Sequence, residues 1–341
     1  MRILRIFVAL VAGLLVVAGT WLAWQWNLRP SVYGYASELA IAPADSAAGA
    51  DGLRVTFLGV STLLFRDAKT AVMTDGFFTR PGLVRTALGR IEPDAERIDA
   101  ALKMAGIEHL DAIVTGHSHY DHAMDTADVA SRTGAVIVGS ESTANTARGR
   151  DFPESRIHVV RGTETLSFGD LTVTVVPSRH FPHGQGMGEI TRPLATPARV
   201  TEYLEGGSFS IFVERAGRTA LVQSSAGYVE GALAGRKADV VFLGIGLLGT
   251  KDDAYRDAYW RETVAAVGAK RVIPIHWDDF TRGLEQPLVA LPFLLDRVDV
   301  AMAFVRERAG RDRIDVRWPA VAEPFDPFEG LAAAASSGNP P

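Results

Sequence analysis

The sequence predicts an α/β protein of the α+β kind: a four-layer sandwich preceded by one transmembrane helix. Short β-branched runs bounded by Gly, Pro or polar turns predict strands. Runs with helical periodicity lie between some of them. Two sheets with helices on both outer faces is the natural packing for such a set of elements. An apolar stretch near the N-terminus is long enough to cross a bilayer.

The composition is that of a folded domain and narrows the chemistry. The 341 residues include 47% hydrophobic and 22% charged residues, with a formal net charge of −5. This excludes a disordered chain, and mild acidity without a basic stripe predicts no nucleic-acid partner. The chain has no cysteine, which excludes disulfides, iron–sulfur clusters, thiolate zinc sites and a cysteine nucleophile. A metal site would therefore use His, Asp and Glu.

The N-terminal segment, residues 1–30, is predicted to be a membrane anchor that contacts the lipid bilayer through residues 6–28. That stretch has no charged residue, and Arg2 and Arg5 precede it. Aromatic residues cluster at its far end, where an aromatic belt would sit: Trp21, Trp24 and Trp26. A cleaved signal peptide is the alternative, but its apolar core would be unusually long and no A-x-A site follows directly.

The charges before the anchor predict its orientation. The positive-inside rule places Arg2 and Arg5 in the cytoplasm, so the domain lies outside it. The expected localisation is a single-pass membrane protein, on the periplasmic side of the inner membrane if the source is Gram-negative. After the anchor we expect a linker over 31–52, one domain over 53–328, and a disordered, low-complexity tail over 329–341.

Strands and helices are expected throughout the domain. The expected strands are 54–58, 62–65, 70–73, 112–115, 135–138, 171–176, 209–213, 219–222, 240–243, 271–275 and 314–316. The clearest helical patterns are 95–104, 123–133, 257–267 and 287–297.

Three histidines fall within six residues after the apolar run DAIVT: His117-Ser118-His119-Tyr120-Asp121-His122. In an extended chain His117 and His119 point the same way, because the side-chain period of a strand is two. Asp121 and His122 then begin the next helix. Four potential ligands converge, and neutral imidazole with carboxylate suits zinc, iron or manganese.

Two further histidines end strand-like runs. His180 lies in VTVVPSRHFPHG and His276 in RVIPIHWDDF. His183 competes with His180, which is preferred because it lies nearer the strand end, where geometry is most fixed. His109 and His158 lack such a context and are expected on the surface.

H-x-H-x-D-H after a strand resembles the metallo-β-lactamase superfamily, which has an αββα sandwich and a hydrolytic site of one or two metals. The resemblance extends from about Leu53 to Pro319, and FLGVSTLLF and TDGFF are similar to the family's first strands and early Asp turn. It implies Zn2+ as the cofactor, one or two ions, with Mn2+ and Fe as alternatives. It implies these ligands: His117, His119 and His180 for metal one, and Asp121, His122 and His276 for metal two.

The motifs PSRHF, GGSFSIFVE and PIHWDDF resemble one branch in particular. It contains the L-ascorbate-6-phosphate lactonase-like and N-acyl-phosphatidylethanolamine phospholipase D-like proteins. This implies a membrane-anchored hydrolase of an ester, lactone or phosphodiester bond, using a metal-bound hydroxide on a small-molecule or lipid-derived substrate. Asp121 would orient the water and take its proton. Tyr120 and Tyr228 flank ligand positions and are the expected oxyanion donors, with packing as the alternative.

One position departs from the family pattern. An Asp that bridges the two metals is expected after the strand TALVQ, and Ser225 stands there instead. We expect one tight metal and a weak or absent second, because a negative charge is missing between two dications. The alternatives are a hydroxide bridge with Ser225 behind it, or a substitute acid from the same edge: Asp75, Asp278, Asp279 or Glu189.

Two other functions compete with hydrolysis. One is a non-catalytic metal-binding protein that retains the fold without the bridging Asp; the six retained ligand positions favour the enzyme. The other is a redox enzyme with iron in the site. Residues 181–207 are expected to form a lid, in which Arg192 and Arg199 either meet an anionic substrate or are ordinary surface charges.

Overall fold

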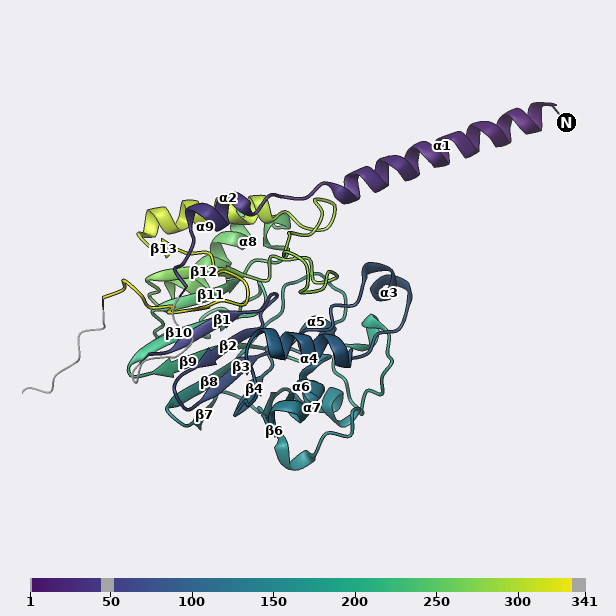
Figure 1. Ribbon diagram of the computed structural model, residues 1–341. Coiled ribbons are helices and arrows are strands. Elements are labelled where there is room, and N and C mark those ends of the chain that lie inside the picture. Colours follow the sequence, from purple (N-terminus) through teal and green to yellow (C-terminus); the bar gives the residue numbers. More distant parts are fainter. Residues whose placement is uncertain (1, 44–51, 333–341) are drawn as a thin grey trace, which may run out of the picture.

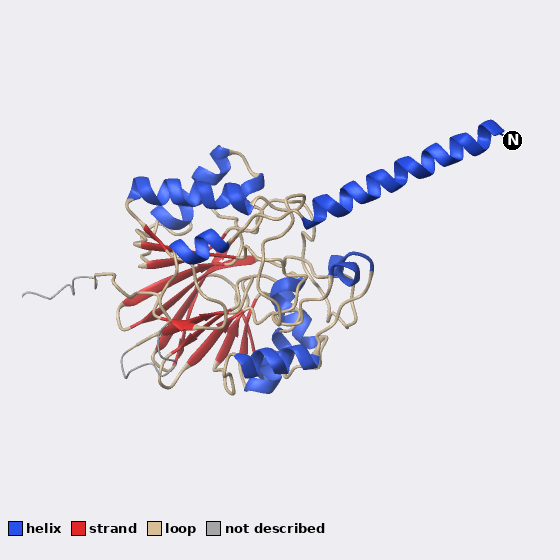
Figure 2. Cartoon of the chain, turned by 45° about the horizontal axis from the view of Figure 1, so that its top comes forward, coloured by secondary structure: helices blue, strands red, loops and turns tan. Residues whose placement is uncertain are grey.

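Two β-sheets packed face to face form the centre of the molecule, and helices cover both outer faces (Figure 1 and Figure 2). The computed structural model describes residues 2–43 and 52–332. Positions 44–51 of the expected linker and 333–341 of the expected tail lie outside the described residues. The αββα sandwich predicted from the sequence is confirmed.

The first sheet contains seven strands in the order β14-β1-β2-β3-β4-β5-β6. Pairing is antiparallel from β14 to β3 and parallel from β3 to β6. The strands are β1 (Arg54–Phe57), β2 (Leu63–Arg66), β3 (Ala71–Thr74), β4 (Ala112–Val114), β5 (Val136–Gly139), β6 (Ile157–Val159) and β14 (Pro324–Phe325).

The second sheet also contains seven strands, in the order β13-β12-β11-β10-β9-β8-β7. The strands from β7 to β10 pair antiparallel, and those from β10 to β13 pair parallel. Their bounds are β7 (Glu164–Phe168), β8 (Leu171–Ser178), β9 (Ser208–Arg215), β10 (Arg218–Gln223), β11 (Val240–Gly244), β12 (Arg271–Ile275) and β13 (Asp315–Val316).

The helices form the outer layers. Those near the first sheet are α3 (Leu83–Leu88), α4 (Ala95–Met104), α5 (Tyr120–Ala123), α6 (Thr126–Thr133) and α7 (Glu141–Arg148). The second sheet is covered by α8 (Asp253–Trp260), the π-helical turn η4 (Arg261–Ala265) and α9 (Val298–Asp312). Short 3-10 turns are η1 (Glu154–Arg156), η2 (Val200–Glu202) and η3 (Leu248–Thr250).

The core between the sheets is apolar and tightly closed. Phe65 of β2 and Phe242 of β11 meet edge to face with ring centroids 5.8 Å apart, and both are fully buried. A separate cluster, including Ile98 and Leu102 of α4 and Ile113 of β4, joins the outer helices to the first sheet. Burial on both faces explains why β3, β4 and β11 are continuous apolar runs.

One predicted helix is wrong. Residues 287–297 contain no helix or regular strand, and α9 begins directly afterwards at Val298. Pro292 in the middle of the segment lacks an N–H group and disfavours a helical conformation at the preceding residue. Strands β6, β7 and β14, which are short or partly exposed, were not predicted from the sequence.

α1 (Arg2–Asn27) is exposed along its length and projects away from the sandwich (Figure 1). Among the described helices, α1 alone is long and apolar enough to cross a membrane. A signal sequence near the N-terminus has the same length and composition. The described part of the expected linker is more ordered than predicted. It contains α2 (Tyr33–Glu38), and Ile41 is buried and donates its N–H to the carbonyl of Trp318 (3.1 Å).

Candidate metal centre

The predicted ligands come from the carboxyl ends of strands in both sheets. His117 follows β4, His180 follows β8 and His276 follows β12, while Asp121 and His122 lie on the short helix α5. Strand ends at one edge of a sandwich bring residues that are far apart in sequence to one place. The structure assembles all six into two adjacent groups.

The first group consists of His117, His119 and His180, whose candidate ligand atoms lie within 4.8 Å of one another. His117 is fully buried, and neither of its ring nitrogens has a hydrogen-bond partner among the described residues. A buried polar atom without a partner is costly. A cation held between the three rings would satisfy it, so this donor set fits a metal.

The environment keeps the first group neutral. Burial and the neighbouring histidines hold the pKa of His117 well below its usual range. Burial also lowers the pKa of His119, and it lowers that of His180 to about 2. Neutral imidazole is the form that binds a metal.

Backbone carbonyls fix the rings of His119 and His180. The Nε2 of His119 lies 3.2 Å from the carbonyl oxygen of Gly186, and the Nδ1 of His180 lies 2.8 Å from that of Phe181. Each contact assigns a proton to one nitrogen and leaves the other for a ligand role. Gly186 has φ +60°, and a Cβ there would lie 2.7 Å from the His119 ring, so only glycine fits.

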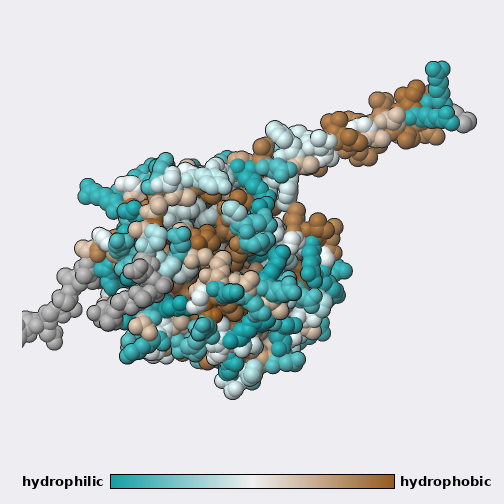
Figure 3. Space-filling model, viewed as in Figure 1, coloured by the Kyte–Doolittle hydropathy of each residue, from teal (hydrophilic) through white to brown (hydrophobic). Residues whose placement is uncertain are grey.

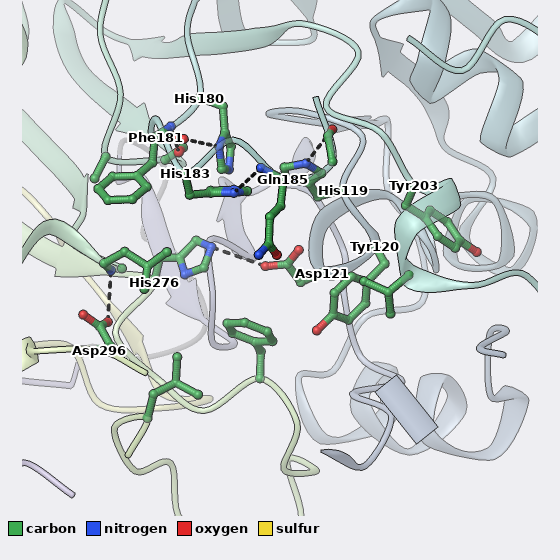
Figure 4. Close-up of a pocket in the computed structure, with 18 of the residues that line it drawn as sticks. His119, Tyr120, Asp121, His180, Phe181, His183, Gln185, Tyr203, His276 and Asp296 are labelled. Atoms are coloured by element: carbon green, nitrogen blue, oxygen red, sulfur yellow. Dashed lines mark hydrogen bonds and ion pairs between the residues drawn. The ribbon is translucent and has the colours of Figure 1, made fainter. Parts of the chain in front are cut away.

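The second group consists of Asp121, His122 and His276. The Oδ2 of Asp121 lies 3.4 Å from the Nε2 of His276 (Figure 4) and 3.5 Å from that of His122. Behind the group, Asp75 Oδ2 accepts from His122 Nδ1 (2.8 Å) and from the Ser61 hydroxyl (2.5 Å). Asp75 therefore orients His122 so that its Nε2 faces Asp121.

Charge distinguishes this group from the first. Burial lowers the pKa of His122, but the carboxylates of Asp75 and Asp121 outweigh burial and raise it. Burial also raises the pKa of Asp121, and His122 and His276 more than offset this, so it is well below its usual value. The second group therefore carries a carboxylate charge that the first lacks.

Backbone strain is concentrated beside the second group. His276 has φ 56° and Asp75 has φ 59°, both in the left-handed region that non-glycine residues rarely adopt. The turn is held because the His276 N–H donates to the carbonyl of Val60 (2.7 Å), whose own N–H donates to Asp278 (2.8 Å). Arg80 pairs with Asp278 at 2.7 Å, fully buried.

None of the four acids considered as a substitute bridge lies in the described cavity lining. Asp75 supports His122, Asp278 pairs with Arg80, and Asp279 pairs with Arg29 at 2.6 Å. Glu189 is exposed. Ser225 does line the cavity, and its hydroxyl accepts the N–H of Phe181 (2.9 Å). The charge missing at Ser225 is therefore not replaced from these positions.

A cavity of about 270 Å³ opens over both groups. Its acids are Asp121 and Asp296, and burial raises the pKa of Asp296 to about 6. Asp296 was missed because it falls within the expected helix 287–297. Most other lining side chains are apolar or aromatic: Phe181, Val200, Tyr203, Ala226, Leu247, Phe280 and Leu291.

The two tyrosines expected as donors lie differently from the prediction. Tyr120 lines the cavity, but its hydroxyl points away from Asp121 and the histidines (Figure 4). Burial raises its pKa well above the usual value, and the side chain of Thr86 hydrogen-bonds to it. Tyr228 is not part of the described lining and packs beside Tyr255, with ring centroids 5.6 Å apart. Tyr120 therefore borders the cavity and Tyr228 is outside its described lining, and their role as oxyanion donors stays a prediction.

The expected lid, residues 181–207, covers one side of the cavity through Phe181, Gln185 and Tyr203. Arg192 and Arg199 are exposed and lie outside the described lining. His183 lines the cavity, with its ring centroid 4.8 Å from that of His180, but belongs to neither ligand group.

Comparisons with known proteins show the family of this chain. Residues 83–277 match the family described as Beta-lactamase superfamily domain. A UPF0173 metal-dependent hydrolase of Heliobacterium modesticaldum is 26% identical over 233 residues, covering 67% of this chain and 84% of the relative. Its counterpart in Ligilactobacillus salivarius is 27% identical over 233 residues, covering 67% and 86%.

The fold also matches a solved structure. A possible metal-dependent hydrolase from Veillonella parvula aligns with a TM-score of 0.50 at 15% identity, covering 81% of this chain and 99% of that one. At this identity the likeness bears on the fold alone.

Proposed function

This chain belongs to the beta-lactamase superfamily and is a metallo-hydrolase, and on that premise we propose that it is a membrane-anchored enzyme cleaving an ester, lactone or phosphodiester bond. One observation carries the chemistry. Two ligand groups lie side by side at one cavity, and the buried His117 has no hydrogen-bond partner among the described residues.

The residues of the two ligand groups have two roles, cation binding and proton transfer. His117, His119 and His180 would hold one cation, and Asp121, His122 and His276 a second. A divalent cation such as Zn2+ supplies hydroxide at neutral pH by lowering the pKa of water toward about 7. Asp121 lines the cavity and stays ionised, so with only the first group filled its carboxylate would orient a water molecule and accept its proton.

The substrate and the anchor are supported by separate features. The motifs PSRHF and PIHWDDF resemble the lactonase-like and phospholipase D-like branch, which favours lactones and phosphodiesters. The apolar lining favours a substrate with an apolar portion. α1 supports anchoring, and Arg2 and Arg5 before its apolar stretch support a domain outside the cytoplasm.

The test is hydrolysis by the zinc-loaded full chain of p-nitrophenyl acetate, bis(p-nitrophenyl) phosphate and a simple lactone. We expect turnover of at least one, lost on chelation and restored by zinc. His117→Ala should abolish turnover and metal retention together, while the matched surface variant His109→Ala keeps both. Turnover by metal-free His117→Ala would contradict the proposal.

A further inference from the structure

Three consecutive apolar side chains are exposed on the loop before α9. Phe293, Leu294 and Leu295 have exposed fractions of 38%, 48% and 41%. Soluble surfaces scatter such residues singly, whereas a contiguous group marks an interaction site. The loop has no helix or strand of its own that would require them.

This loop is joined to the end of α1. The N–H of Phe293 donates to the carbonyl of Leu28 (3.0 Å), one residue beyond the helix. Arg29 Nη1 donates to the carbonyl of Ala290 (2.8 Å) and to Asp279 Oδ2 (2.6 Å). The loop is therefore fixed at the C-terminal end of α1, where the anchor of the proposed function would leave the membrane.

The distance along α1 from its tryptophans to Leu28 places the end of the helix in the membrane interface. Trp24 and Trp26 mark the headgroup region, and Leu28 follows Trp24 by about 6 Å at the helical rise of 1.5 Å per residue. The interfacial layer on each side of the hydrocarbon core is roughly 5–8 Å deep. Phe293, paired with Leu28, consequently lies within reach of the lipid headgroups and the first acyl carbons.

A second apolar element faces the same side. α3 lies on the side of the domain from which α1 projects (Figure 1 and Figure 2). Its residues Val84 and Leu88 are 72% and 87% exposed. Figure 3 shows apolar residues gathered there, below the point where α1 leaves the domain. The two elements are separate in sequence and share one face.

The same loop forms part of the cavity wall. Leu291, two residues before Phe293, and Asp296, one residue after Leu295, both line the cavity. A short piece of chain thus runs from the end of the anchor to the metal centre. Leu291 and Phe280 are apolar members of the same cavity lining.

We propose that Phe293–Leu295 and the exposed face of α3 dock on the lipid surface around α1, and that the site takes amphiphilic substrates with an acyl chain directly from that bilayer. This rests on the proposed function, of which it specifies the substrate class. The loop lowers the cost of moving an apolar chain from lipid to the cavity, because the chain passes along apolar side chains rather than through water.

The docking is tested without reference to activity. The chain has no cysteine, so single nitroxide labels can be placed by Leu294→Cys and Leu88→Cys, with Thr165→Cys on β7, far from α1, as the control (Figure 1). In phosphatidylcholine vesicles carrying the full chain, the first two labels should collide more with oxygen than with a water-soluble nickel chelate. Labels as accessible to nickel as the one at position 165 would overturn the docking.

The substrate class is tested by chain length. The probes are p-nitrophenyl acetate in solution and p-nitrophenyl palmitate in the vesicles; water cleaves each ester to the carboxylic acid and p-nitrophenol. Replacing Phe293, Leu294 and Leu295 together by Ser should lower palmitate kcat/KM about tenfold, as expected for losing roughly one buried apolar side chain, and leave acetate unchanged. Met104→Ser, an exposed apolar control on α4, should change neither.

The outcomes separate the two proposals. Equal loss with both esters, or no loss with palmitate, would overturn delivery from the bilayer while leaving the hydrolase intact. Absence of turnover with every ester, phosphodiester and lactone would count against the proposed function instead. In that case the collisions of the labels with oxygen and with the nickel chelate would still decide whether the loop and α3 dock on lipid.

Discussion

The two ligand groups differ in charge although they lie side by side. His117, His119 and His180 are three imidazoles whose surroundings hold them neutral. Asp121, His122 and His276 include a carboxylate, and Asp75 stands behind His122 with a second one. The ring centroids of His117 and His122, one from each group, are 3.8 Å apart. A cation in one group would therefore repel a cation in the other.

This difference indicates unequal metal sites. Two dications at about 4 Å repel strongly unless negative charge lies between them. Ser225 lines the cavity at the position where a bridging Asp is expected, and it brings no charge. We therefore expect the first cation to bind tightly in the three-histidine group and to oppose the second. Variants in each group should therefore have unequal effects on metal binding.

The largest effect should come from removing one ligand of each group in turn. His180→Ala leaves two histidines for the first cation. It should lower kcat/KM for hydrolysis by roughly a thousandfold, because the cation that would activate water is lost. His276→Ala should retain one cation per chain and more activity than His180→Ala. Elemental analysis and kcat/KM measure both, and the reverse order of the two variants would contradict the assignment.

Asp75→Asn should act on the second group alone. Its carboxylate accepts from His122 Nδ1 at 2.8 Å, and loss of such a supporting acid typically weakens metal affinity by about 10- to 100-fold. Competition with a chromogenic chelator should show the weaker site weakened and the tighter site unchanged. Equal weakening of both would mean that the groups bind as one unit.

Ser225→Asp should strengthen the second metal site. A carboxylate at this position adds negative charge to the cavity lining. The affinity for the second cation should therefore rise by about tenfold, in line with a small Coulomb gain in a partly hydrated site. Ser225→Asn is the matched neutral control. Unchanged occupancy in Ser225→Asp would show that charge is not what limits the second site.

The smallest effect should be a pH dependence of opposite sign in the two groups. The depressed pKa values of His117, His119 and His180 mean that the unfolded chain takes up more protons below pH 6.5, so stability falls as the pH falls. His122, with a raised pKa, contributes stability below pH 6.5 that is lost as the pH rises through its folded value.

For the metal-free protein the first group should dominate, at up to about 1.4 kcal/mol per histidine and pH unit. Thermal unfolding at pH 7.5 and 5.5 measures this. His180→Asn should reduce the loss on acidification and His122→Asn should increase it. A metal-free protein equally stable at both pH values would contradict the neutral state of the first group.

The sequence predicted the sandwich well because strand and helix patterns in a buried core follow directly from hydrophobic periodicity. It also placed all six ligand positions at the ends of strands or on α5, where motif spacing determines geometry. It failed for residues 287–297, where apolar side chains suggested a helix. They are apolar for other reasons: Leu291 lines the cavity, and Phe293, Leu294 and Leu295 are exposed beside α1.

Side-chain direction was the other limit. Tyr120 lies next to a ligand in sequence, yet its hydroxyl turns away, and Tyr228 packs against Tyr255 instead of facing the cavity. Rotamers depend on tertiary neighbours that no local pattern contains. Asp296 lines the cavity, but its segment carries no ligand motif, so the sequence did not predict a place for it in the site.

The most direct test of unequal sites is metal stoichiometry by elemental analysis of the full chain, loaded with excess zinc and then dialysed against increasing volumes of metal-free buffer. We expect one cation per chain to be retained throughout and a second to be lost early. Two equally tight cations would contradict the charge argument, and no retained cation after loading with zinc, manganese or iron would contradict the metal centre itself.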